Sequence, residues 1–300
     1  MKKIIMDIDP GHEDFFGLML AIANREELKL AAVVTTVAYQ TPKNVLNNAL
    51  KALTLLGCKD IPVAQGASKP LVEPLVLADN WRTTTGLDGA DFPSPNFEAS
   101  SFTGLSLMAQ VLSTSVEPVT IAVSGPLTNT ALLLQQHPEV HDKIAEIVVM
   151  GGGIDAWNRR PGVEYNFSID PEAAEIVVNS GVKVTLITRD LTEQGVISNS
   201  TVTKMASLGN PVSDVAARLM KHYGDFGATV VLNDPEVQAY LIKPELFKGY
   251  LANVSIDLED GPQRGHMTVN DDLAANVTLL TSMDNDGFVE LLLRSLRKFG

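Results

Sequence analysis

Apolar and polar residues follow one another in blocks along most of this chain, as they do where strands and helices alternate. Short runs of aliphatic and β-branched residues predict buried strands, and apolar residues that recur every three or four positions predict the helices between them. The predicted strands cover residues 3–6, 28–36, 61–64, 119–123, 144–150 and 182–188. The predicted helices cover residues 15–21, 45–56, 105–112, 129–136 and 171–178. This series predicts an α/β fold with an open, mostly parallel β-sheet that helices flank on both faces.

The rest of the chain follows the pattern less closely. Residues 65–104 are rich in proline, glycine, aspartate and threonine and show no periodicity, which predicts a long loop region of the kind that often carries function. Residues 191–243 have a helical pattern, and residues 251–300 predict one or two strands and a helix over 287–299. No internal repeat or linker divides the chain, so we expect a single domain over residues 1–300.

The composition excludes several classes of partner. Twenty-three basic and thirty-six acidic residues give a net charge of −13, which opposes binding to nucleic acid or to an anionic membrane surface. We expect no signal peptide in the first residues, and no apolar stretch approaches the about twenty residues of a membrane span. The one cysteine, Cys58, permits no internal disulfide and is expected to be a small buried side chain. We therefore expect a cytoplasmic protein without nucleic acid or membrane partners.

Four acidic residues follow the first predicted strand within eight positions: Asp7, Asp9, Glu13 and Asp14. Carboxylates that converge at the end of a strand repel one another unless a cation or a shared proton holds them, so the cluster predicts a cation site. In an alternative interpretation, Glu13 and Asp14 only complement the positive end of a helix dipole and Asp7 is a solvated acid. His12 stands among them, and we expect it to face solvent at the start of the helix.

In a parallel sheet the residues just after each strand gather along one edge, where ligands bind. The segments expected at this edge are residues 9–14, 36–40, 124–129, 150–153 and 189–192. Two of them are rich in glycine, but neither spells the phosphate-binding loop of nucleotide hydrolases or a dinucleotide-binding fingerprint. Phosphate binding by these turns is therefore not expected.

Several motifs stand in order along the chain: Asp-Ile-Asp-Pro-Gly-His-Glu-Asp at 7–14, Gly-Pro-Leu-Thr-Asn at 125–129, Met-Gly-Gly-Gly at 150–153, Glu-Tyr-Asn at 164–166 before Asp-Pro-Glu-Ala-Ala at 170–174, and Asp-Pro at 234–235. In these motifs the chain resembles, from end to end, the nucleoside hydrolases of the inosine-uridine-preferring type. The resemblance implies an open α/β fold, a tightly held Ca²⁺, and hydrolysis of the N-glycosidic bond of ribonucleosides to ribose and free base. It also implies a homo-oligomer, either a dimer or a tetramer.

The resemblance assigns a metal site to four residues. The ligands would be the side chains of Asp9, Asp14 and Asp234 and the backbone carbonyl of Ser124. Oxygen ligands of this kind suit a hard cation such as Ca²⁺. Asp9 would also be the general base, because it would take a proton from a metal-bound water as that water attacks the anomeric carbon. Asp7 would stand behind the ligands and orient them.

The resemblance also assigns substrate contacts, and this chain departs from the family at four positions: Glu13, Tyr39, Arg82 and Asn233. Asn158, Glu164 and Asn166 occupy positions that contact the ribose. Glu13 is one methylene longer than the family's aspartate and would bring its carboxylate into the space of the 2′ and 3′ hydroxyls. Asn233 stands where pyrimidine-specific and broad-specificity members have a histidine that helps to protonate the leaving base, and an amide cannot act as a general acid. We count Glu13 and Asn233 among the substrate-binding residues.

The side of the site that would bind the base is expected to involve the long loop. Trp81 and Arg82 resemble the purine-preferring branch, in which an indole stacks on the base and contributes about 1–3 kcal/mol. Trp81 is therefore a candidate base-binding residue and favours a purine leaving group, although a structural anchor within the loop is the favoured alternative. Tyr39 takes the place of an asparagine that reaches the sugar in the family.

Other functions remain open at this point. The absent histidine and Glu13 also fit a homologue that binds nucleosides or ribose without turnover, or an N-glycosidase with a modified substrate. An Asp-x-Asp motif after a strand also opens a class of Mg²⁺-dependent phosphatases, in which Asp7 would be the nucleophile. That class needs a downstream lysine and a Gly-Asp pair at a strand end, and we find neither.

Overall fold

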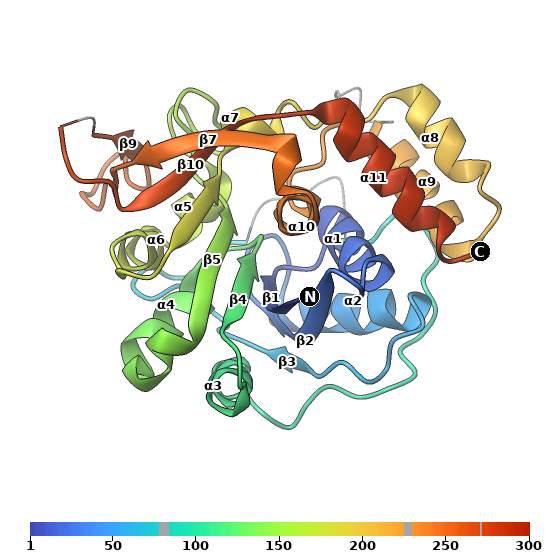
Figure 1. Cartoon of the computed structure of the whole chain (residues 1–300), viewed down its shortest axis with the longest axis horizontal. Helices are drawn as coiled ribbons and strands as arrows, with labels where there is room; N and C mark the ends of the chain where they lie inside the picture. Colours follow the sequence, from blue (N-terminus) through green and yellow to red (C-terminus); the bar gives the residue numbers. More distant parts are fainter. Residues whose placement is uncertain (78–83, 225–229, 271) are drawn as a thin grey trace.

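An eight-stranded β-sheet runs through the middle of the molecule (Figure 1). The structure is a computed structural model that describes residues 1–77, 84–224, 230–270 and 272–300. The strand order is β3-β2-β1-β4-β5-β6-β10-β7, and every neighbouring pair is parallel except β10 and β7. The strands of this sheet are β1 (Lys2–Ile8), β2 (Leu28–Thr35), β3 (Val63–Gln65), β4 (Val119–Val123), β5 (Ile144–Met150), β6 (Val184–Ile187), β7 (Phe247–Ala252) and β10 (Val277–Met283).

Helices cover both faces of the sheet (Figure 1). One face carries α1 (His12–Ala23), α2 (Pro42–Leu55), α8 (Asn199–Ala206), α9 (Pro211–Gly224), α10 (Pro235–Ile242) and α11 (Asn285–Arg297). The other face carries α3 (Gly104–Thr114), α4 (Thr128–Gln136) and α6 (Pro171–Val178). Shorter elements lie in the connections: α5 (Tyr165–Ile169), α7 (Arg189–Thr192), and the 3₁₀ turns η1 (Pro138–Lys143) and η2 (Pro244–Leu246).

Each face of the sheet has its own apolar core, because side chains alternate along a strand. Ile4, Met6 and Ile8 of β1 belong to the core beneath α1, α10 and α11. Ile5 belongs to the core beneath α3, α4 and α6. Asp7, two residues further along β1, faces the same side as Ile5 and therefore points toward α4.

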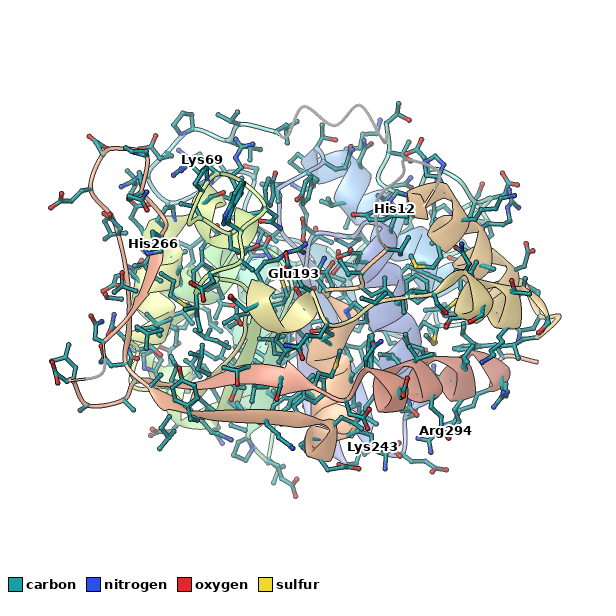
Figure 2. The ribbon with its side chains drawn as sticks, turned by 90° about the horizontal axis from the view of Figure 1, so that it is seen from above. His12, Lys69, Glu193, Lys243, His266 and Arg294 are labelled. Atoms are coloured by element: carbon teal, nitrogen blue, oxygen red, sulfur yellow. The ribbon has the colours of Figure 1, made fainter. Side chains whose placement is uncertain are left out.

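The parallel strands end at a common edge of the sheet. The register pairs Ile8 at the end of β1 with Thr35 at the end of β2, and Asp7 with Val123 at the end of β4. In the view from above, Glu193, which follows α7, lies over the middle of the molecule, and His12 of α1 lies to one side of it (Figure 2). The turns after these strands therefore converge on one region.

The predicted α/β fold with a mostly parallel sheet and helices on both faces is confirmed. The C-terminal part differs from the prediction, because residues 247–283 form four strands instead of one or two. β8 (Val254–Ile256) and β9 (Met267–Val269) form a separate antiparallel pair. These two strands have three residues each, and β7 has four exposed residues in a row, so none shows the apolar pattern that identifies a strand. Within the described residues, no helix combines the length and the apolar character that crossing a membrane requires.

Candidate active site

A cavity of about 360 Å³ opens at the carboxyl edge of the sheet. Its wall combines the ends of β1, β4 and β5 with α1, α7 and the segments before α5 and α10. Five acidic side chains line it: Asp9, Glu13, Asp14, Glu164 and Asp234. Four amide side chains line it as well: Gln40, Asn158, Asn166 and Asn233. Arg189 is the one lysine or arginine among the described residues of this wall.

Asp14 is held from two sides in the first turn of α1. Its Oδ2 accepts a hydrogen bond from the backbone amide of Gly11 at 3.3 Å, and the Ser124 hydroxyl donates to its Oδ1 at 2.6 Å. Asp9, directly after β1, lies against Gly125, where an added Cβ would come within 2.8 Å of Asp9 Oδ1. Glycine at position 125 thus leaves room for the Asp9 carboxylate beside the turn of Ser124.

Burial raises the pKa values of the three aspartates at the cavity, and repulsion between carboxylates adds to the rise at Asp9 and Asp234. Burial, followed by the charge of Asp14, raises the pKa of Asp9 well above its usual range. Burial, followed by the charges of Asp14 and Glu13, does the same to the pKa of Asp234. Burial raises the pKa of Asp14 to about 6, although the hydrogen bonds from Ser124 and Gly11 act in the opposite direction. A cation placed among these carboxylates would relieve their repulsion.

Glu164 lies at the cavity, but its carboxylate is bonded to the backbone. Its Oε1 accepts from the amide of Asn166 at 2.9 Å, and its Oε2 accepts from the amides of Phe167 and Gly152, both at 3.1 Å. Burial raises the pKa of Glu164, and these three hydrogen bonds lower it. Glu164 therefore caps α5 and joins it to the turn after β5.

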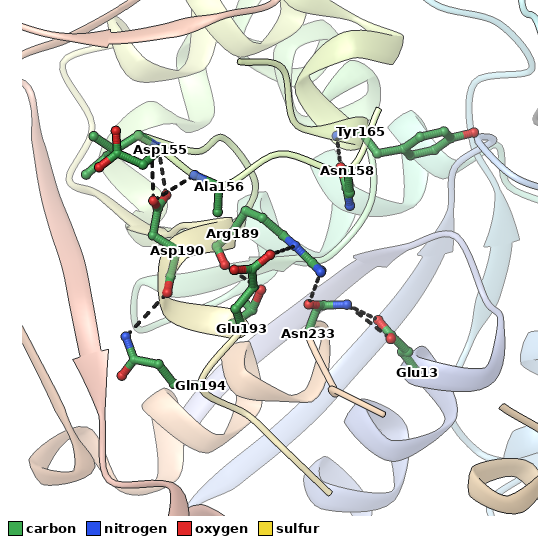
Figure 3. A network of polar contacts seen from close by, with 12 residues as sticks. Glu13, Asp155, Ala156, Asn158, Tyr165, Arg189, Asp190, Glu193, Gln194 and Asn233 are labelled. Carbon is green, nitrogen blue, oxygen red and sulfur yellow. Dashed lines mark hydrogen bonds and ion pairs between the residues drawn. The ribbon is translucent and has the colours of Figure 1, made fainter. Parts of the chain in front are cut away.

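The two other residues expected to contact the sugar also lie on this wall. Asn166 Nδ2 donates to the carbonyl of Ser124 at 3.0 Å and to that of Met150 at 3.1 Å, so it connects the ends of β4 and β5. Asn158 Oδ1 accepts from the amide of Tyr165 at 2.8 Å (Figure 3). The structure thus brings the candidate metal-ligating carbonyl and the candidate sugar-contacting amides together.

Asp7 differs from the expectation that it orients the neighbouring acids. It is fully buried, and its carboxylate accepts from Asn129 Nδ2 and from the Thr130 hydroxyl, both at 2.8 Å. These partners belong to α4, which follows the turn of Ser124. Because Asp7 points to the α4 face of the sheet, it anchors that turn instead of contacting Asp9 or Asp14.

His12 also differs from its expected position, because it is buried and not directed to solvent. Its Nε2 lies 2.7 Å from the carbonyl of Asp88 and therefore carries the donated proton. Its ring packs 5.8 Å from the ring of His222 and 5.7 Å from that of Tyr223. Gly89 has a φ of +97°, and a Cβ there would lie 2.4 Å from His222, so only glycine fits. This contact joins α1, α9 and the loop over residues 84–89 into one wall of the cavity.

Glu13 and Asn233, two of the departures from the family pattern, contact each other (Figure 3). Asn233 Nδ2 donates to both carboxylate oxygens of Glu13, at 3.1 and 2.9 Å. Arg189 Nη1 donates to Asn233 Oδ1 at 2.6 Å. Burial raises the pKa of Glu13 to about 7, while the Asn233 bond and the Arg189 charge lower it. Arg189 thus offsets part of the negative charge on the Glu13 side of the cavity.

Tyr39 lies at the cavity with its ring stacked on Tyr165. The ring centroids are 4.0 Å apart and the planes differ by 13°. This stack occupies the end of the second strand, where the sequence lacks the family's asparagine. The predicted base-binding residue Trp81 and its neighbour Arg82 lie outside the described residues.

The amino-acid sequence from residue 4 to residue 290 matches the family model described as inosine-uridine preferring nucleoside hydrolase. The chain belongs to this family. It is similar to the pyrimidine-specific ribonucleoside hydrolase RihA of Shewanella baltica strain OS155, at 43% identity over 99% of this chain and 97% of the relative. RihA of Enterobacter sp. strain 638 is also 43% identical, over 99% of this chain and 98% of the relative.

Two solved structures share the fold of this nucleoside hydrolase. A purine-preferring ribonucleoside hydrolase from Gardnerella vaginalis matches with a TM-score of 0.92 and 24% identity over 99% of both chains. An inosine-guanosine nucleoside hydrolase matches with a TM-score of 0.91 and 22% identity over 100% of both chains. The family and the enzyme class expected from the sequence are therefore confirmed, and the chain is a nucleoside hydrolase.

Members of the family use a metal ion, and the donor chemistry of this cavity fits one. As the side chains lie, no three acidic, histidine or cysteine residues in the described part of the chain are already gathered closely enough to hold an ion. The repulsion that contributes to the raised pKa values of Asp9 and Asp234 is nevertheless what a cation would remove. Together with the Ser124 carbonyl these residues offer oxygen atoms alone, which suits a hard cation.

Arg189 and Tyr165 are site residues that the sequence did not identify. Arg189 stands directly after β6, at the edge where ligands bind, and a basic residue at that position was the available signal. Tyr165 lies beside Glu164 and Asn166, and its neighbours were the available signal. The sequence around Arg189 and Tyr165 does not indicate which side chains these two residues contact across the cavity.

Proposed function

We propose that this nucleoside hydrolase cleaves ribonucleosides to ribose and free base, with Asp9 as the general base. Asp9 takes a proton from the water that attacks the anomeric carbon, while the bond from that carbon to the base nitrogen breaks and the base gains one proton. The observation that carries the proposal is the burial of Asp9 beside Asp14. Burial and the nearby charge of Asp14 both raise the pKa of Asp9, and therefore the affinity of its carboxylate for a proton.

We propose Ca²⁺ as the metal ion, held by Asp9, Asp14, Asp234 and the Ser124 carbonyl. When bound, Ca²⁺ makes a water molecule more acidic and binds sugar hydroxyls. The chain prepares these ligands in advance. The Ser124 hydroxyl fixes Asp14 at 2.6 Å, and Asn166 fixes the Ser124 carbonyl at 3.0 Å.

The ribose is proposed to lie between these ligands and the wall formed by Glu13, Asn158, Glu164 and Asn166. Cleavage of the bond to the base develops positive charge on the sugar ring, because the transition state resembles an oxocarbenium ion. Fixed carboxylates and amide oxygens near the ring stabilise that charge without rearranging. The hydrogen bonds that hold Glu164 and Asn166 to the backbone give this wall its rigidity.

Pyrimidine ribonucleosides are the proposed substrates, because the relatives at 43% identity are named pyrimidine-specific. This proposal replaces the purine preference expected from the sequence, which these relatives do not confirm and which rested on Trp81. Asn233 has no proton to give to the leaving base. We therefore propose that the base takes its proton from solvent.

Release of reducing sugar from uridine, cytidine, inosine and adenosine tests this function. The expected result is one ribose for each free base, with uridine and cytidine cleaved faster than the purine ribonucleosides. Calcium measured in the purified protein tests the proposed ion. If none of the four substrates releases ribose while calcium is bound, the alternative of a nucleoside-binding homologue without turnover is supported instead.

Two further expectations stay predictions. The cytoplasmic location follows from the sequence alone, and the assembly into dimers or tetramers follows from the resemblance alone.

A further inference from the structure

The backbone that carries Arg189 is fixed at the edge of the cavity. The amide of Arg189 donates to the carbonyl of Gly152 at 2.8 Å. The next side chain, Asp190, accepts from the three backbone amides of residues 154–156 at 2.7, 2.8 and 2.9 Å (Figure 3). The turn of α7 is therefore tied to the loop after β5, and the arginine enters the cavity from a rigid base.

The Arg189 guanidinium has one strong partner and one weak partner. Its Nη1 donates to Asn233 Oδ1 at 2.6 Å. Its Nε lies 3.4 Å from Glu193 Oε1, and the Glu193 side chain is 51% exposed while that of Arg189 is 15% exposed. Exposed ion pairs contribute little, whereas a buried hydrogen bond that involves a charged group contributes substantially. The contact with Asn233 is therefore the one that defines the position of the guanidinium.

Asn233 transmits this constraint because the two ends of an amide have opposite roles. A guanidinium only donates, so the amide oxygen must face Arg189. The amide nitrogen then faces Glu13 and donates to both of its carboxylate oxygens, across 220 residues of sequence. Each carboxylate oxygen keeps a lone pair that can accept from a group in the cavity. A carboxylate held in this way can accept from two adjacent hydroxyl groups at once.

We propose that Arg189 is a positioning residue: through the Asn233 amide it fixes the Glu13 carboxylate as an acceptor for the 2′ and 3′ hydroxyls of ribose, and so selects ribonucleosides over 2′-deoxyribonucleosides. This inference rests on the proposed function, because it takes the ribose to lie against Glu13. A 2′-deoxyribonucleoside leaves one acceptor of the fixed carboxylate unpaired. Sites that hydrogen-bond a substrate hydroxyl discriminate strongly against the analogue that lacks it.

Steady-state kinetics of four proteins test the proposal: the wild type, Arg189→Met, Arg189→Lys and Glu193→Gln. The substrates are uridine, 2′-deoxyuridine and a riboside with a 4-nitrophenolate leaving group, which departs without a proton. In Arg189→Met, kcat/KM for uridine should fall about 10- to 100-fold, and the preference for uridine over 2′-deoxyuridine should fall about fivefold or more. The nitrophenyl riboside should lose as much as uridine, because the two share the sugar.

The two other variants test whether the effect comes from the hydrogen bond to Asn233, from the positive charge of residue 189 or from its ion pair with Glu193. Arg189→Lys should recover part of the preference, because an ammonium can donate to the Asn233 oxygen but without the planar geometry. Glu193→Gln removes only the exposed partner of Arg189 and should match the wild type for all three substrates. Thermal melting of each variant shows whether the fold is kept.

Three results would overturn the proposal. The first is an equal loss for uridine and 2′-deoxyuridine, which would assign Arg189 a general structural role. The second is a loss for uridine but none for the nitrophenyl riboside, which would place Arg189 at the leaving base. The third concerns binding. If the wild type cleaves none of the substrates, the proposed function itself fails, and calorimetric binding of uridine and 2′-deoxyuridine is compared instead. An unchanged binding preference in Arg189→Met then overturns the positioning role.

Discussion

Replacement of Asp7 by asparagine should make the protein more stable at neutral pH, although Asp7 is fully buried beside the active site. One carboxylate oxygen accepts from Asn129 Nδ2 and the other from the Thr130 hydroxyl, both at 2.8 Å. In Asp7→Asn the amide oxygen can accept from Asn129, and the amide nitrogen can donate to the Thr130 hydroxyl, which is both donor and acceptor. The substitution therefore keeps both side-chain hydrogen bonds and removes the charge, which the backbone of Thr130 also stabilises in the wild type.

The magnitude follows from the pKa of Asp7, which burial raises from 3.8 to about 6 against the opposing effect of the Asn129 and Thr130 bonds. The folded protein binds the Asp7 proton more tightly than the unfolded chain does. This contribution to stability is complete below the unfolded pKa and is lost as the pH rises through the folded pKa. Between pH 4 and pH 7 the loss amounts to about 2 kcal/mol of unfolding free energy. Asparagine does not titrate, so the variant escapes this loss.

Urea unfolding at a series of pH values, in the presence of a chelator, measures the effect. The wild type and Asp7→Asn should have similar unfolding free energies near pH 4. At pH 7.5 the variant should be more stable by about 2–3 kcal/mol, or about 5 °C in Tm. The difference between the two proteins isolates Asp7 from the other acids with raised pKa values. A difference that does not change with pH, or a variant less stable than the wild type at pH 7.5, would refute this reasoning.

Two further variants test how the site is held together. Ser124→Ala keeps the backbone carbonyl but removes the hydroxyl that donates to Asp14 at 2.6 Å. Since hydrogen bonds to charged groups contribute about 1.5–3 kcal/mol, we expect calorimetry of chelator-treated protein to show about tenfold weaker Ca²⁺ binding. An unchanged affinity would contradict the role of this hydroxyl. Glu164→Gln replaces one acceptor oxygen of the α5 cap by an amide group that can only donate and that faces backbone amides. We expect a loss of about 2 kcal/mol of unfolding free energy, which thermal melting should show as a Tm lower by about 4 °C. A Tm equal to that of the wild type would show that the cap does not depend on the charge.

The fold and the acid cluster could be predicted because their signals are local. Aliphatic runs such as residues 119–123 and 144–150 identify strands without knowledge of the rest of the chain. Asp9 and Asp14 follow directly after such a strand, and parallel strands place their ends at one edge. The antiparallel pair of β8 and β9 has no such signal, because three-residue strands are too short to show a period.

Contacts between distant segments could not be predicted in the same way. The bond between Asn233 and Glu13 joins residues 220 positions apart, and nothing in either segment specifies the other. The same reason explains the burial of His12, which depends on α9 and on the loop over residues 84–89. Asp7 was expected to orient Asp9 and Asp14, but its carboxylate is bonded to Asn129 and Thr130 of α4, 122 and 123 residues away along the chain.

The central claim, that Asp9 is the general base of ribonucleoside hydrolysis, is tested most directly by ribose release from uridine with the wild type and Asp9→Asn at saturating Ca²⁺. Bound calcium and uridine binding are measured in both proteins, because Asp9 is also a proposed ligand. The account predicts equal amounts of ribose and uracil from the wild type, and a rate lower by about 1,000-fold or more in a variant that still binds calcium and uridine. A calcium-loaded Asp9→Asn whose rate lies within about tenfold of the wild type would contradict the account, because a general base contributes about 10²- to 10⁴-fold.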